Sequence, residues 1–69
     1  MNTDKLKQQA DALEKQAQEN EIAANDFLKD TDSIKYFGKD WTEAKAEELR
    51  GRARSARKLA ADIRSKISN

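Results

Sequence analysis

The chain has 69 residues, of which 39% are charged and 36% hydrophobic, and its formal net charge is +1. This length allows one domain at most, predicted to span residues 1–69. Because the sequence contains neither Cys nor His, disulfide bonds are excluded, and so are the usual protein ligands of zinc and haem.

A first amphipathic helix is predicted over residues 4–29. Its hydrophobic stripe alternates steps of four and three residues, which places the stripe on one face of an α-helix. The stripe consists of Leu6, Ala10, Leu13, Ala17, Asn20, Ala24 and Phe27. Thr3 is the predicted N-cap, and no Pro or Gly interrupts the segment. Asn20 is the polar member, and we interpret it as a residue that fixes the register of helix pairing.

The connection over residues 30–40 is rich in residues that favour turns and helix caps. We predict one short helical turn here, capped by Asp32 or Ser33 and stopped by Gly38. Hydrophobic side chains near the connection are expected to form a plug that closes this end of the molecule. They are Phe27, Ile34, Tyr36, Phe37 and Trp41, which include every aromatic residue of the chain. A pocket for an aromatic ligand is the alternative.

A second amphipathic helix is predicted over residues 41–67. Its stripe has the same spacing and consists of Thr42, Ala46, Leu49, Ala53, Ala56, Ala60, Ile63 and Ile67. Asp40 and Glu43 match a capping box at its start. Gly51 lies inside the predicted helix, where it costs about 1 kcal/mol relative to Ala.

These elements predict an all-α fold, an antiparallel two-helix hairpin with a short helical turn in the connection. Most stripe positions are Ala, which buries little area. At about 25 cal/mol per Å² of apolar surface, such a seam barely offsets the entropy of ordering the chain. We therefore expect a second copy, giving a four-helix bundle, or a different protein partner.

The two halves of the chain differ in charge. Residues 1–40 hold six Lys and nine Asp or Glu, a net charge of −3, whereas residues 41–69 hold eight Lys or Arg and four Asp or Glu, a net charge of +4. An antiparallel register centred near residue 35 predicts that Glu21 meets Arg50 and that Glu14 meets Arg57. Basic side chains left without an evident partner are Arg52, Arg54, Lys58 and Arg64.

This basic face permits an alternative function, because a row of cations on a helix can neutralise phosphates. In that alternative the chain is a nucleic-acid-binding regulator of RNA or DNA. The residues that would carry it are Arg50, Arg52, Arg54, Arg57 and Lys58.

A second apolar strip lies on the other flank of the predicted hairpin and would be exposed to water in a lone copy. Its members are Ala12, Ala23, Trp41 and Leu59. We therefore expect a non-enzymatic protein–protein interaction module, a small accessory or regulatory factor that docks this face on a second copy or on a partner protein.

Catalytic chemistry is not expected, because the commonest general base and the best nucleophile are both missing. The segment from Asp30 to Trp41 begins like a calcium-binding loop but lacks its Gly and its terminal Glu. No cofactor or metal is therefore predicted. Residues 1–20 lack the apolar core of a signal peptide and no apolar run could span a membrane, so a cytoplasmic location is expected.

Overall fold

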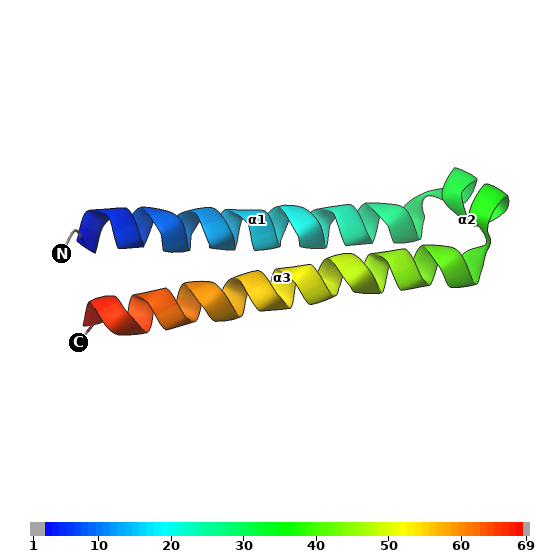
Figure 1. Cartoon of the computed structure of the whole chain (residues 1–69). Coiled ribbons are helices and arrows are strands. Elements are labelled where there is room, and N and C mark those ends of the chain that lie inside the picture. The colour runs from blue at the N-terminus through cyan, green and yellow to red at the C-terminus, as the bar shows by residue number, and fades with distance from the viewer. Residues whose placement is uncertain (1–2, 69) are drawn as a thin grey trace.

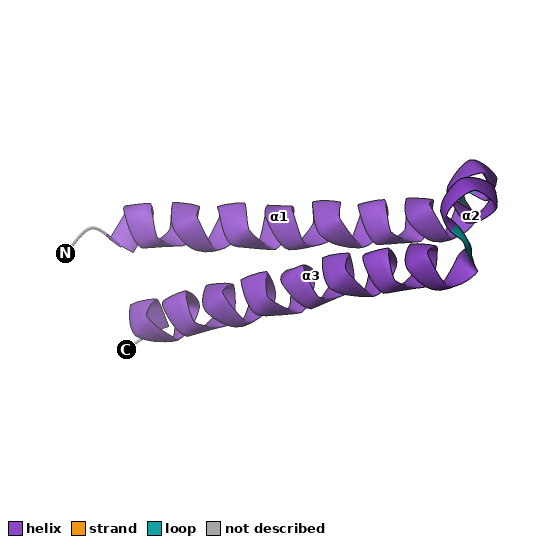
Figure 2. Ribbon diagram, turned by 45° about the vertical axis from the view of Figure 1, so that its right-hand side comes forward, coloured by secondary structure: helices purple, strands orange, loops and turns teal. Residues whose placement is uncertain are grey.

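The computed structural model describes residues 3–68, which form three helices: α1 (Thr3–Lys29), α2 (Thr31–Phe37) and α3 (Lys39–Ser68). The long helices α1 and α3 pack against each other in antiparallel orientation, and α2 lies at the end where they are joined (Figure 1). The turned view shows α2 folded across this closed end and a short loop leading into α3 (Figure 2). The molecule is a rod of 51 × 14 × 12 Å. The predicted all-α helical hairpin is confirmed.

Alanine forms the buried seam between the two long helices. The fully buried alanines recur every seven residues on each helix: Ala10, Ala17 and Ala24 on α1, and Ala46, Ala53 and Ala60 on α3. Ala17, Ala53 and Ala56 form the core cluster, with Leu13 packed against it. The predicted antiparallel register centred near residue 35 likewise places Ala17 opposite Ala53. Because the side chain of Ala is a single methyl group, the two backbones can approach closely along this seam.

The larger hydrophobic residues of both stripes lie at the edges of the seam rather than at its centre. Those that are only half-buried include Leu6, Leu13, Leu49, Ile63 and Ile67. The largest fully buried side chain is Thr42. Alanine at the central positions brings the helices close together and displaces longer side chains outward. The hairpin therefore has a thin core, as the composition predicts.

Asp30 caps α2, and the prediction of Asp32 or Ser33 as the cap is wrong. The backbone of Asp30 is extended, with φ −80° and ψ 99°. Its carboxylate accepts hydrogen bonds from the backbone N–H of Asp32 at 3.0 Å and of Ser33 at 3.4 Å, and from the Ser33 hydroxyl at 2.9 Å. A carboxylate reaches the free N–H groups two and three residues further along the chain, which makes residue 30 the cap.

Gly38 ends α2 and also precedes α3. Its N–H donates to the carbonyl of Ile34 at 3.0 Å, and its carbonyl accepts from the N–H of Thr42 at 3.1 Å and from the Thr42 hydroxyl at 2.9 Å. Its φ of 91° is accessible to glycine and strained for other residues. The prediction that Gly38 stops the short helical turn is confirmed.

The predicted capping box at the start of the second helix is wrong. Because Gly38 already supplies the first helical carbonyl, α3 begins at Lys39, and Asp40 lies inside its first turn. Glu43 instead approaches Lys39, one turn earlier, at 3.9 Å.

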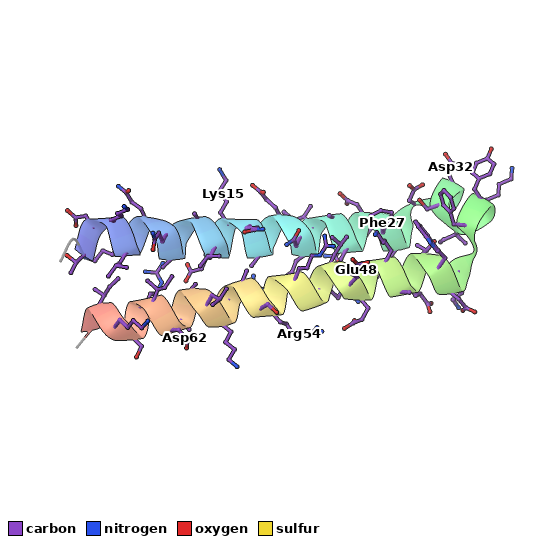
Figure 3. All side chains as sticks on the ribbon, viewed as in Figure 1. Lys15, Phe27, Asp32, Glu48, Arg54 and Asp62 are labelled. Atoms are coloured by element: carbon purple, nitrogen blue, oxygen red, sulfur yellow. The ribbon has the colours of Figure 1, made fainter. Side chains whose placement is uncertain are left out.

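The outer surfaces of the hairpin are charged. Lys15 points away from α3, and Arg54 and Asp62 point away from α1 (Figure 3). Neither long helix contains an apolar window of the length that a membrane crossing requires, and the same holds for α2 within the described residues.

Candidate interaction surface

One flank of the hairpin carries an open, shallow groove of about 570 Å³ between α1 and α3. From α1 it is lined by Leu13 and Gln16, and from α3 by Glu48, Gly51, Arg52 and Leu59, among others. In α3 these positions recur at steps of three, four and seven, so they share a face by the 100° turn per residue. Leu59 remains 54% exposed in this groove. The flank thus offers apolar surface with a charged pair beside it.

The predicted interface residues have different places on this flank. Leu59 lines the groove. Ala12 is exposed and Ala23 half-buried on the same flank of α1, and neither lines the groove. Trp41 is 43% exposed and lies at the closed end, about two helix turns from Glu48, the residue of the groove nearest to it in α3. Of the four predicted interface residues, Leu59 is therefore the one that lines the groove.

The aromatic side chains at the closed end form a smaller cluster than predicted. The ring of Trp41 lies 4.5 Å from that of Phe37 and 6.3 Å from that of Phe27, measured between centroids. Phe37 is itself 60% exposed, and Tyr36 lies under the ammonium group of Lys35 rather than in the cluster. Phe27, Phe37 and Trp41 therefore close this end, while Phe37 and Trp41 extend the exposed apolar surface.

Gly51 has no packing role within the hairpin. A methyl group at this position would meet only the guanidinium of Arg54, at an ordinary contact distance of 3.6 Å. Its backbone has no positive φ that would require glycine. Glycine in a helix is less stable than alanine by roughly 0.5–1 kcal/mol. The presence of Gly51 beside the groove is therefore unexplained by the fold of a single chain.

The opposite flank is an ionic seam between the two helices. Arg57 pairs with Glu21, and Arg64 binds Glu14 at 2.9 Å and Asp11 at 2.5 Å. The hydrogen bond from Arg64 lowers the pKa of Glu14, and the two carboxylates raise the pKa of Arg64. The interpretation of Arg64 as a residue without a partner is wrong, because it binds two carboxylates of α1.

The predicted pairs of Glu21 with Arg50 and of Glu14 with Arg57 are also wrong. Each glutamate instead meets an arginine seven residues further along α3. Side chains on a helix lean toward its N-terminus, by about one turn for a long side chain. In an antiparallel pair, side chains of the two helices therefore lean in opposite directions. A glutamate of α1 then meets an arginine whose backbone lies further along α3 than the residue directly opposite. The alanine register is thus as predicted while the ion pairs are shifted.

Other basic side chains of α3 also have partners. Arg50 donates to the amide oxygen of Asn25 at 3.3 Å. Arg52 and Arg54, predicted to lack partners, bind Glu48 and Glu47 of their own helix, each at 2.8 Å. Glu48 precedes Arg52 by four residues, the ordinary spacing of an ion pair on a helix, whereas Glu47 precedes Arg54 by seven residues, two turns away on the same face. Among the described residues, Lys58 forms no ion pair.

No cluster of three or more metal-ligating side chains occurs within residues 3–68. Comparison with models of protein families, with curated proteins and with solved structures finds no match to the chain.

Proposed function

We propose that the chain is a non-enzymatic protein–protein interaction module that docks the flank containing Leu59 on a protein partner. What supports this proposal is the contrast between the core and the surface. The buried seam consists of alanines and Thr42, whereas Leu59 and Trp41 remain about half exposed on one flank. Fully burying an exposed large apolar side chain contributes roughly 1.5–3 kcal/mol, and covering the exposed half of each of these two would contribute about half of that. A partner covering this flank would supply the apolar burial that the hairpin lacks.

The charge pattern favours this proposal over binding of nucleic acid. A surface that binds phosphates needs cations that are free to exchange their counterions. Four of the five residues that would carry this alternative, Arg50, Arg52, Arg54 and Arg57, already bind acidic or amide side chains of the same chain.

The docking face can be tested with two matched variants. Leu59→Glu should weaken association by at least about tenfold, whether the wild type self-associates in sedimentation equilibrium or retains another protein from a cell extract, because the charge cannot be buried unpaired. Ile22→Glu is the control: Ile22 is 53% exposed, matching Leu59, and lies about 120° around α1 from Gln16 of the groove. Ile22→Glu should associate as tightly as the wild type.

Equally tight association of the wild type and Leu59→Glu, with helix content unchanged by circular dichroism, would contradict the docking face. Fluorescence anisotropy with labelled single-stranded RNA and duplex DNA at low salt tests the alternative. Tight binding that weakens steeply with added salt and is lost in Arg54→Gln would favour nucleic acid as the partner.

A further inference from the structure

We propose that the protein partner is a second copy of this chain, packed with its α3 antiparallel to the first α3 across the groove flank. This inference rests on the proposed docking face and names its occupant. Three observations carry it: the excess surface of the single chain, the symmetry of the side chains on α3, and the position of Gly51.

The single hairpin exposes more surface than a compact protein of its mass. Its accessible surface is 5250 Å², whereas a folded monomer of 7.8 kDa is expected to expose about 4,400 Å². The excess is about 850 Å². Each partner in a protein–protein interface of standard size buries about 800 Å². One interface between two copies would therefore give each chain the burial that is ordinary for a protein of its size.

The groove flank of α3 is complementary to itself in one antiparallel register. Trp41 and Leu59 are equally far from residue 50, about 13 Å along the helix on either side. Glu48 and Arg52 are also placed symmetrically about residue 50. A twofold axis near this residue therefore puts Trp41 of each copy against Leu59 of the other. It also puts Glu48 of each copy against Arg52 of the other, so the ion pair within each α3 becomes part of a group of four alternating charges. Such an interface is isologous, since the same surface serves both copies.

The same axis accounts for features at the centre and at the closed end. Gly51 lies one residue from the axis along α3 and about 80° around the helix from the line through Trp41 and Leu59, so it borders the contact, where the absence of a side chain lets the second copy approach. Phe37, whose ring lies against that of Trp41, enlarges the apolar surface at the end of α3 that Leu59 of the other copy would meet.

An arrangement with both hairpins pointing the same way lacks this match. There, α3 of one copy would lie against α1 of the other in the register that α1 and α3 already share. Trp41 would then lie near the charged Lys29 and Asp30 of the second copy, and Glu48 would not meet Arg52. The antiparallel arrangement covers both apolar anchors and pairs both charges.

Charge reversal tests the register directly. Sedimentation equilibrium should give twice the chain mass for the wild type. Glu48→Arg alone and Arg52→Glu alone should each associate at least about tenfold more weakly, because each variant places like charges opposite each other. An equimolar mixture of the two should regain the wild-type association as a mixed dimer. The double variant, Glu48→Arg with Arg52→Glu, is the matched control and should dimerise alone. Trp41 fluorescence should shift to longer wavelength on dilution.

Helix content by circular dichroism ensures that each variant is folded. If the single variants remain dimeric, or if mixing them restores nothing, this register is overturned. If the wild type stays monomeric at millimolar concentration, the second copy is overturned as the partner. The proposed docking face is judged separately: if Leu59→Glu associates as tightly as the wild type, with a second copy or with another protein, that face is overturned.

Discussion

The two glycines of the chain have different backbone conformations, so replacing them has opposite consequences. Gly38 has φ 91° and ψ 156°, a region that is essentially restricted to glycine. Gly51 lies in regular helix, and only the Arg54 side chain comes within 4 Å of a methyl group built there.

Gly38→Ala should lower the free energy of unfolding by about 1–3 kcal/mol, because alanine is strained at this φ and ψ. Gly51→Ala should raise it by about 0.5–1 kcal/mol, because alanine restricts the unfolded chain and suits the helix. Urea denaturation followed by circular dichroism, at concentrations where the chain is monomeric, measures both values. A destabilising Gly51→Ala at such concentrations would mean that Gly51 has an intramolecular role.

The Asp30 cap makes the stability of the closed end depend on pH. The Ser33 hydroxyl, followed by the backbone N–H groups of Ser33 and Asp32, lowers the pKa of Asp30. The stabilisation is therefore complete above the ordinary carboxyl pKa of about 4 and is lost as the pH falls through the lowered value. Glu14, whose pKa is also lowered, adds to the same loss.

Thermal melting between pH 7 and pH 2 should show this loss in the wild type. Asp30→Asn keeps an acceptor for the backbone N–H groups but cannot titrate, so its melting temperature should fall less over the same range. An equally steep decline in Asp30→Asn would show that Asp30 does not contribute to the acid sensitivity.

The role of a residue is predicted best where its own backbone preference determines the structure, as for Gly38, which ends the short helix α2. The sequence does not single out Asp30 as the N-cap of α2, because all four residues at positions 30–33 are of types that cap helices, and only the observed backbone conformation distinguishes them. The observed ion pairs differ from the predicted ones because backbone register alone does not include the lean of long side chains along a helix.

The long helices illustrate how a periodic sequence determines an element. The repeated spacing of four and three predicts both helices, and α1 and α3 begin within two residues of their predicted starts. The larger side chains were expected to share the seam, but alanine occupies its centre. Alanine takes the central positions because the two backbones approach closely, and the spacing of hydrophobic residues in the sequence does not show how closely they approach.

Ala17→Leu tests this close approach. Ala17 is fully buried against Ala53 and Ala56, so a larger side chain must push the helices apart and should cost about 1–3 kcal/mol of stability. Ala61→Leu is the control, since Ala61 is exposed on the ionic flank of α3 and its replacement should change stability by less than about 0.5 kcal/mol. Urea denaturation compares the two. Equal stability of both variants would mean that the seam has room for leucine.

At the scale of the molecule, the sequence predicts the hairpin and the presence of exposed apolar residues on one flank. Helical periodicity alone predicts that Leu59 lies exposed on this flank, and it does line the groove. The groove beside it was not, because its walls come from Leu13 and Gln16 of one helix and Glu48 and Arg52 of the other. Residues so far apart in sequence are brought together by the register, which the pattern gives only approximately.

The alanine seam also determines how the hairpin responds to temperature. The heat capacity change of unfolding grows with the apolar surface that becomes exposed, and a core whose largest fully buried side chain is Thr42 hides little of it. The stability curve of a single hairpin is therefore shallow, and it changes slowly between cold and warm conditions. Covering the groove flank would add heat capacity and curvature, so an associated hairpin should melt more sharply than a single one.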